Sequence, residues 1–160
     1  MAGDSAGAHL AVAVALRARR EGLPVPAALA LFGPLIDPAY RASIADSRTR
    51  SQPFDRRAAA RAVALYVGGH DVDDPRLCLL NADLSVLPPT QLHYGTREVM
   101  RADAEAFAAR MAASGGRCDE RVWPRLMHGY WLWPRGGGRA SLMAAGQFLR
   151  TAVDEADTAS

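Results

Sequence analysis

The stretch GDSAG at residues 3–7 decides the fold. It has the form G-x-S-x-G, and an Ala- and Leu-rich segment over residues 6–20 follows it directly. This combination is typical of a nucleophile elbow, a strained turn between a strand and a helix that exposes a serine, with small residues on either side so that the backbones can approach. We therefore expect a strand that ends before Ser5, a helix that begins at Ala6, and a serine hydroxyl placed for nucleophilic attack.

The rest of the chain alternates between helix-like and strand-like segments. Strands that alternate with helices of this length indicate βαβ units and a mostly parallel sheet with right-handed crossovers. The sequence therefore predicts the α/β fold class, with a polar, irregular stretch over residues 37–53. The expected helices are residues 6–20, 54–66, 102–114 and 139–155, and the expected strands are residues 27–32, 90–94 and 118–123, the last of them cut by Pro124.

Length and charge narrow the range of functions. The chain has 160 residues, the size of one ordinary domain, and its 19 basic and 17 acidic residues leave a net charge of +2. Nucleic-acid binding shows itself as a basic patch or stripe, so this balance argues against a nucleic-acid partner. No segment reaches the ~18 apolar residues of a membrane helix, and no signal-peptide pattern is present. We expect no membrane span and a cytoplasmic location.

The two cysteines, Cys78 and Cys118, show no CxxC spacing. Such a pair indicates free, partly buried thiols, so we expect neither a zinc site nor a disulfide framework.

A serine nucleophile needs a general base within hydrogen-bond reach, and histidine is the usual one. His9 is expected to be a helix-surface or packing residue, His70 a solvated loop residue, and His93 a core or face residue of a strand. His128 instead follows the last strand and precedes the final helix, at the sheet edge where active sites of α/β folds lie. We therefore predict that His128 is the base.

The acid that orients this base should lie between the serine and the histidine in the chain. Glu98 comes just past the end of a strand, on the same expected sheet edge as Ser5 and His128, and is the preferred candidate. The other carboxylates of the interval are Asp83, the turn-forming Asp71, Asp73 and Asp74, and the helical residues Asp103 and Glu105, for which capping or solvation is expected.

Taken together, these segments resemble the hormone-sensitive-lipase-like group of α/β-hydrolases, the fold-3 carboxylesterases and lipases. The resemblance runs from residue 1 to about residue 150 and rests on a succession of motifs at the family's own spacing. The motifs are GDSAGAHLA at 3–11, EGLPVPAALALFGPLID at 21–37, YVGG at 66–69, DDPRLCLLNADLSVLPPT at 73–90, YGTREVMRADAEAFAARMAASG at 94–115 and VWPRLMHGYW at 122–131. The family usually has a second glycine where this chain has Ala8.

The resemblance implies hydrolysis of small-molecule carboxylic esters by a Ser-His-Glu triad through an acyl-enzyme intermediate. Carried over position by position, Ser5 is the nucleophile, His128 the base and Glu98 the acid, where the family has Asp or Glu. The backbone N–H of Ala6 is expected to stabilise the oxyanion, and no metal or organic cofactor is expected. Residues 37–66 are expected to line part of the acyl or alcohol pocket.

The aromatic residues that follow the base can serve either that pocket or the core. They are Tyr130, Trp131 and Trp133. The residues alone do not decide between the two roles.

Some parts that the family places before the elbow do not occur in this sequence. There is no HGGG-type motif, the family's usual source of further oxyanion donors, and only residues 1–2 remain of the strand that leads into the elbow. We expect this to leave the strand at 27–32 with an open apolar edge and to place the N-terminal ammonium where burial is costly. The chain is thus expected to be the C-terminal part of an α/β-hydrolase domain over residues 1–155, without the N-terminal strands and cap, followed by a disordered tail over 156–160.

Two functional hypotheses remain. In the first, the chain is a serine ester hydrolase of the esterase and lipase type, truncated and with impaired or no activity. In the second, it is a catalytically inert hydrolase fragment that needs a partner chain, or a missing N-terminal half, to supply the absent strands. A nucleotide-binding βαβ unit is a weaker third hypothesis, because the sequence has neither GxGxxG nor a P-loop.

Overall fold

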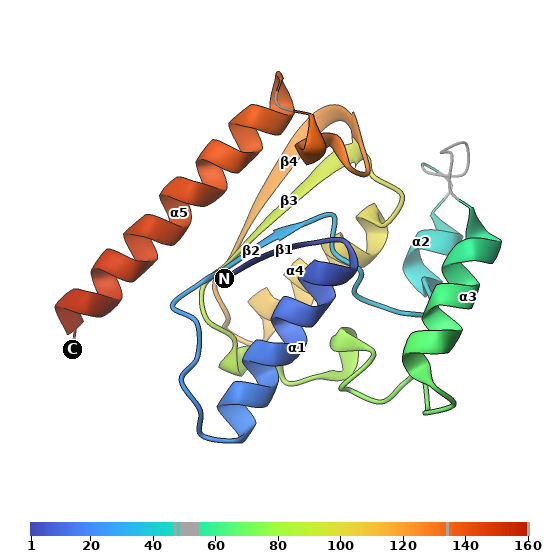
Figure 1. Cartoon of the computed structure of the whole chain (residues 1–160), viewed down its shortest axis with the longest axis horizontal. Helices are drawn as coiled ribbons and strands as arrows, with labels where there is room; N and C mark the ends of the chain where they lie inside the picture. The colour runs from blue at the N-terminus through green and yellow to red at the C-terminus, as the bar shows by residue number, and fades with distance from the viewer. Residues whose placement is uncertain (47, 49–54, 134, 160) are drawn as a thin grey trace.

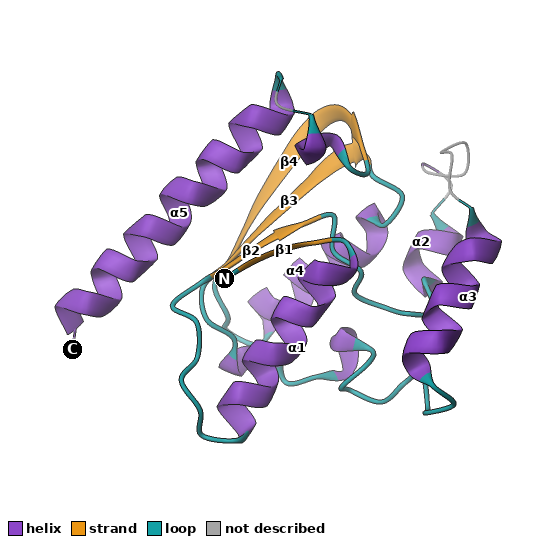
Figure 2. Ribbon diagram, in the orientation of Figure 1, coloured by secondary structure: helices purple, strands orange, loops and turns teal. Residues whose placement is uncertain are grey.

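A four-stranded parallel sheet forms the centre of the computed structural model, which describes residues 1–46, 48, 55–133 and 135–159 (Figure 1, Figure 2). The strands lie in the order β1-β2-β3-β4, which is also their order along the chain. They are β1 (Ala2–Asp4), β2 (Leu29–Phe32), β3 (Thr90–Arg97) and β4 (Cys118–Met127). Because every pairing is parallel, the carboxyl ends of all four strands meet at one edge of the sheet. The predicted α/β class with a parallel sheet is confirmed.

Helices cover both faces of this sheet (Figure 1). One face carries α1 and α4, the other carries α5, and α2 and α3 lie together beyond the α1–α4 layer. Among the described residues, no helix combines the length and the apolar composition needed to cross a membrane. The α-helices are α1 (Ala6–Arg20), α2 (Arg41–Ala45), α3 (Arg56–Val67), α4 (Arg101–Ala113) and α5 (Gly137–Ala159), and the short 3-10 helices are η2 (Leu79–Asn81), η3 (Leu84–Val86) and η4 (Tyr130–Leu132).

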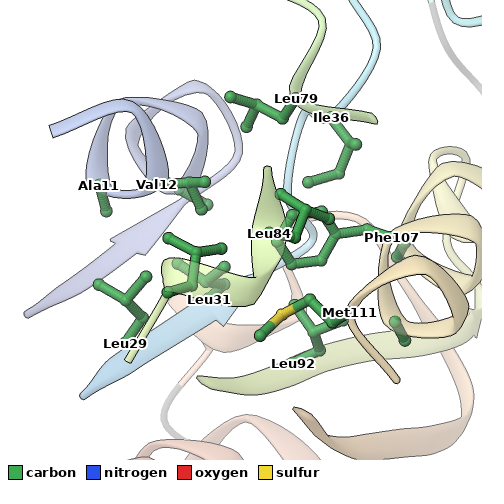
Figure 3. Packing of buried hydrophobic residues seen from close by; sticks show 14 of the residues in the cluster. Ala11, Val12, Leu29, Leu31, Ile36, Leu79, Leu84, Leu92, Phe107 and Met111 are labelled. Carbon is green, nitrogen blue, oxygen red and sulfur yellow. The ribbon is translucent and has the colours of Figure 1, made fainter. Parts of the chain in front are cut away.

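The main hydrophobic core lies between the sheet and the α1–α4 layer (Figure 3). Alternate residues of a strand share a face, so Leu29 and Leu31 of β2 point into this core together with Leu92 of β3. Val12 of α1 and Phe107 of α4 pack against them, and all five side chains are fully buried. This packing fixes α1, and with it the turn that precedes the helix, against the sheet.

The intervening residues of β2 form a second, smaller core on the opposite face. Ala30 and Phe32 pack there against Tyr130 and Trp131 of η4 and Ala145 of α5. The sequence is compatible with Tyr130 and Trp131 in either the substrate pocket or the core. The structure buries both side chains in this second core. Since η4 directly follows the predicted base, this second core fixes the position of the base's loop.

The strand that leads into the elbow differs from the prediction. It covers Ala2–Asp4 rather than residues 1–2, and it pairs with β2 in register, Gly3 opposite Leu31. The open edge of the sheet therefore belongs to β1, and the strand predicted at 27–32 is buried at every position of β2. The N-terminal ammonium donates to the Ala28 carbonyl at 2.8 Å, and partial burial lowers its pKa, in the direction expected from desolvation.

Two further elements run longer than the sequence indicated. β4 continues past Pro124 to Met127, because it is an edge strand and a proline there loses no ladder hydrogen bond that the sheet needs. α5 continues through Ala159, so residues 156–159 are helical and not part of a disordered tail. Its last turns contain alanine and neither glycine nor proline, so nothing in the sequence ends the helix earlier. Residue 160 lies outside the described residues.

The irregular stretch predicted over residues 37–53 contains the short helix α2. The helix predicted over 54–66 is α3, which ends one residue later, at Val67, and residue 54 lies outside the described residues. Asp55 is the N-cap of α3: its carboxylate accepts hydrogen bonds from the amides of Arg57 and Ala58, both at 3.0 Å.

Candidate active site

Ser5 sits on the strained turn that the elbow motif predicts. Its φ of 51° and ψ of −120° are a conformation that residues with a Cβ rarely adopt, and such strain is concentrated at functional sites. The Ser5 amide donates to the Phe32 carbonyl at 2.8 Å, and the Ser5 carbonyl accepts from the Leu35 amide at 3.2 Å. A Cβ on Gly3 would lie 2.4 Å from the Gly7 carbonyl oxygen, so the turn requires glycine two residues before the serine. At Gly7 itself a Cβ would find ordinary contact distances.

Glu98 and His128 form a hydrogen-bonded pair. The His128 Nδ1 lies 2.9 and 3.0 Å from the two carboxylate oxygens of Glu98. The Glu98 carboxylate is completely buried and also accepts from the Met100 amide at 3.1 Å, whereas the His128 side chain is 34% exposed. A carboxylate accepts but does not donate, so Nδ1 carries the proton and the other ring nitrogen, Nε2, is the basic one. This is the tautomer that a general base requires.

Trp131 connects this pair to the elbow. Its indole Nε1 donates to the Asp4 carboxylate at 3.2 Å, one residue before Ser5. The same indole ring packs edge-on against the His128 imidazole, with a centroid distance of 5.1 Å and an interplanar angle of 85°. One side chain therefore contacts both the residue that precedes the serine and the predicted base.

Gly33, in the turn after β2, lies against the same pair. A Cβ at this position would come within 2.7 Å of Glu98 Oε2 and 3.0 Å of His128 Nδ1, and the φ of Gly33 is +46°. The residue before it, Phe32, accepts the Ser5 amide. The structure thus brings Ser5, Glu98 and His128 to one end of the sheet, with a glycine where a larger residue would separate them.

Ala6 is the first residue of α1. Amides of the first helical turn have no acceptor within the helix, and the helix dipole places partial positive charge at that end. The Ala6 N–H therefore lies directly after the serine, at the positive end of the helix dipole.

The other three histidines lie in a helix, a strand and a loop. His9 is buried within α1, 1% exposed, and His93 is fully buried within β3, where burial lowers its pKa to about 4. His93 contacts Gln91 and Trp123 through its ring nitrogens. His70 is exposed. All three placements agree with the sequence prediction.

Among the described residues, no other acid candidate is hydrogen-bonded to His128. Asp71 and Asp74 accept hydrogen bonds from amides two residues on, as predicted for turns. Asp103 is a correction, because it is fully buried rather than capping or solvated and accepts from the Ser43 hydroxyl at 2.6 Å. Burial raises the pKa of Asp103 to about 6. The first turn of α4 faces α2, which the sequence did not predict as a helix.

An apolar groove runs between α2 and α3, with a volume of about 360 Å³. Its walls are mostly small and branched aliphatic side chains, and Val99, the neighbour of Glu98, closes one side. The lining residues belong to the predicted pocket segment 37–66 and to Val67, Val72 and Val99. Among the described residues, no three His, Cys, Asp or Glu side chains gather as a metal site requires.

Parallel strands between helices, a strained serine between the first strand and its helix, and a His–Glu pair at the same sheet end define the α/β-hydrolase class. A family model, Abhydrolase_3, described as alpha/beta hydrolase fold, matches residues 1–132. The chain belongs to this family. It is a member of its hormone-sensitive-lipase-like group and corresponds to the C-terminal part of the fold.

Curated relatives and solved structures agree with this assignment. The chain is 35% identical to an acetyl-hydrolase of Streptomyces hygroscopicus over an alignment of 161 positions, which covers 97% of this chain and 53% of that protein. It is 34% identical to the carboxylesterase/phospholipase LipF of Mycobacterium tuberculosis, over 96% of this chain and 43% of that protein. The crystal structure of an esterase from the bacterial hormone-sensitive lipase family matches with a TM-score of 0.88 and 31% identity, covering 95% of this chain and 52% of that one. The chain spans about half the length of the relatives it matches.

Proposed function

We propose that the protein hydrolyses carboxylic esters, with Ser5 as the nucleophile, His128 as the general base and Glu98 as the acid that orients it. The observation that carries this proposal is the hydrogen-bonded Glu98–His128 pair, with the Glu98 carboxylate buried, at the same sheet end as a serine in a strained conformation. Nucleophilic catalysis needs a strained serine, a base that is paired with its orienting acid, and an imidazole that is exposed on its other side.

The reaction follows in two displacement steps. The Ser5 Oγ attacks the ester carbonyl carbon while His128 Nε2 takes its proton, and the collapse of the tetrahedral intermediate expels the alcohol, which receives that proton. Water then gives a proton to Nε2, attacks the acyl-serine carbonyl carbon, and releases the carboxylic acid and the free Ser5 hydroxyl. Each cycle consumes one ester and one water, and all side chains return to their starting protonation states.

Glu98 and Ala6 contribute electrostatically. The Glu98 carboxylate stabilises the imidazolium that forms during both steps and holds the imidazole in the Nδ1–H tautomer. The Ala6 N–H donates to the developing oxyanion, and the loss of one such donor typically costs about 10²–10³-fold in rate.

The groove between α2 and α3 supports a substrate with an apolar acyl chain. Its aliphatic walls supply no charged partner for an acyl tail, and its volume of about 360 Å³ accommodates short to medium chains. The two relatives are named an acetyl-hydrolase and a carboxylesterase/phospholipase. These names support ester substrates whose acyl groups range from small to larger. We therefore assign the acyl side of the substrate to this groove.

The proposal is tested with p-nitrophenyl esters and a fluorophosphonate probe that labels activated serines. We expect turnover and labelling that Ser5→Ala lowers by at least about 10³-fold, the usual cost of removing a triad member. Ser114→Ala is the matched control, because Ser114 is an exposed serine at the end of α4 whose hydroxyl donates to the Arg110 carbonyl. Equal turnover and equal labelling in the parent and in Ser5→Ala would overturn the proposal and favour the catalytically inert hypothesis.

A further inference from the structure

The helix α3 is attached to the rest of the molecule by very few side chains. Of its described residues only Val67, at its last position, is buried. Tyr66 makes the single side-chain hydrogen bond from α3 to another element within the described part of the chain. A helix with so little buried surface is held in place by whatever specific contacts it has, because hydrophobic packing contributes little.

The partner of Tyr66 is His9, which the proposed mechanism does not use. The His9 Nε2 lies 3.0 Å from the Tyr66 hydroxyl, and the two rings meet edge-on with a centroid distance of 5.3 Å and an angle of 89°. The His9 Nδ1 lies 3.2 Å from the Leu35 carbonyl oxygen. Because a carbonyl only accepts, Nδ1 is the protonated nitrogen and Nε2 accepts the hydrogen bond of the Tyr66 hydroxyl.

This bond depends on a neutral histidine, and the surroundings of His9 favour the neutral form. The His9 side chain is nearly fully buried, and burial lowers its pKa below the ordinary value, opposed in part by the bond to Leu35. The ring therefore keeps a fixed tautomer with one donor and one acceptor, both used.

The same contacts lead back to the serine. His9 lies one helical turn after Ser5, and both its own amide and the Leu35 amide donate to the Ser5 carbonyl, at 3.3 and 3.2 Å. A continuous path of hydrogen bonds thus runs from the Ser5 backbone through His9 to Tyr66. At the Tyr66 end of this path, the next residue in the chain is Val67, which lines the groove between α2 and α3.

We infer that His9 and Tyr66 form a positioning pair that sets the distance between Ser5 and the α3 wall of the groove, and so determines which acyl chain lengths are accepted. The inference rests on the proposed function. Neither residue touches the reacting atoms. An acetyl group is too short to extend far along the groove, whereas a hexanoyl chain needs the α3 wall in place.

The experiment compares p-nitrophenyl acetate with p-nitrophenyl hexanoate in Tyr66→Phe and His9→Ala. We expect Tyr66→Phe to lower the ratio of kcat/KM for hexanoate to that for acetate about fivefold, the size of one net hydrogen bond, mainly through KM for hexanoate. The double variant should lose no more than His9→Ala alone, because both changes break the same bond. Tyr94→Phe is the matched control: it also removes a tyrosine hydroxyl bond, to Glu120, on a different element.

A second measurement does not depend on turnover. Amide hydrogen exchange should become faster across α3 in Tyr66→Phe, and should stay unchanged in α1 and α4. A chain-length ratio that is unchanged in Tyr66→Phe, or an equal loss for both esters, would overturn the positioning role while leaving the proposed function intact. Unchanged exchange in α3 would overturn the anchoring itself. Absence of any Ser5-dependent turnover in the parent protein would instead remove the proposed function, and the acyl selectivity with it.

Discussion

The indole N–H of Trp131 helps to fix the position of His128 relative to the elbow. This indole bonds to Asp4, the last residue of β1, and packs on His128, so it joins the elbow to the loop that holds His128. We expect Trp131→Phe to keep most of the buried ring and lose the bond, which lets the His128 loop move. Small displacements of a catalytic group cost up to about 10²-fold, so kcat/KM should fall by about 5- to 100-fold in ester hydrolysis assays.

The control for this prediction changes the other partner. Asp4→Asn keeps an oxygen acceptor for the indole and should retain most of the activity, whereas Asp4→Ala should match Trp131→Phe. Trp133→Phe alters an indole that is 72% exposed and should change little. Equal activity in Trp131→Phe and the parent would show that packing alone positions His128.

The buried Asp103 carboxyl makes the free energy of unfolding depend on pH. Burial raises its pKa from 3.8 to about 6, helped by the nearby Asp37 and opposed by the Ser43 hydroxyl. A carboxyl with a raised folded-state pKa stabilises the fold fully below pH 3.8, and this contribution is lost as the pH rises through 6. At pH 8 the charged form thus costs up to about 3 kcal/mol relative to the neutral form.

We therefore expect Asp103→Asn to unfold at a higher urea concentration than the parent at pH 8, with the difference shrinking towards pH 4.5. Comparing the two proteins at each pH cancels the titration of other groups, among them the buried His93, whose lowered pKa acts in the opposite direction. Asp83→Asn, an exposed capping position, serves as the control. A difference that does not vary with pH would contradict the assignment.

At this scale the predicted proximity of Glu98 and His128 is present in the structure, whereas the surroundings of Asp103 differ from the prediction. The proximity could be predicted because each residue follows a strand, and parallel strands bring such positions to one edge. Their catalytic roles stay a prediction. Asp103 was misplaced because its burial depends on α2, a five-residue helix with no periodicity to detect. From the sequence no site role is predicted for Gly33, and Trp131 can serve either the pocket or the core, since a glycine after a strand and an aromatic after a histidine are common in turns and cores.

Among the elements, β4 has the most unusual course. It contains Pro124, and Arg125 has a φ of 61°, so the ladder with β3 shifts register between Gly95 and Arg97. The irregularity brings the Leu126 carbonyl against Gly95, where a Cβ would lie only 1.9 Å from the oxygen. The bulge lies two residues before His128, and bulges of this kind re-aim the side chains that follow them.

Gly95→Ala should therefore push the end of β4 outward. We expect a loss of stability of about 1–3 kcal/mol, as for overpacked sites, together with a fall in ester hydrolysis because His128 moves with the strand. Differential scanning calorimetry and turnover rates measure the two effects. Gly146→Ala is the control within α5, since a Cβ there meets nothing within 4 Å and should stabilise the helix by about 0.5–1 kcal/mol.

The limits of α1 were easier to predict than those of β4. α1 has the predicted limits because its composition and its terminal arginines act locally. β4 was predicted to stop at Pro124 because a proline is excluded from a central strand, and only the sheet order reveals that β4 lies at an edge. Strand limits depend on neighbours that the sequence does not identify.

For the molecule as a whole, one exposed feature is the edge of β1. In the described sheet β1 is paired on one side only, and on the adjoining helix α1 the apolar side chains of Leu10 and Val14 are 51% and 48% exposed on one face. Open strand edges beside apolar surface favour association. We expect sedimentation velocity to show self-association that rises with concentration and that Leu10→Lys with Val14→Lys reduces.

Leu65→Lys tests whether any exposed apolar residue has this effect. Leu65 on α3 is 85% exposed, a larger exposed fraction than that of Leu10 or Val14. Its helix lies apart from β1 (Figure 1). Self-association that Leu65→Lys lowers as much as the α1 pair would contradict a role for the β1 edge.

The Asp4–Trp131 bond also has a consequence for the order of folding. It joins residues separated by 127 positions, and the candidate site draws on segments from nearly the whole chain. Contacts so distant in sequence close the largest loops and form late, after the local helices. Ester hydrolysis should accordingly be recovered in the slowest phase of refolding, after most of the helical signal has returned, so that activity reports on the docking of the Trp131 segment against the elbow.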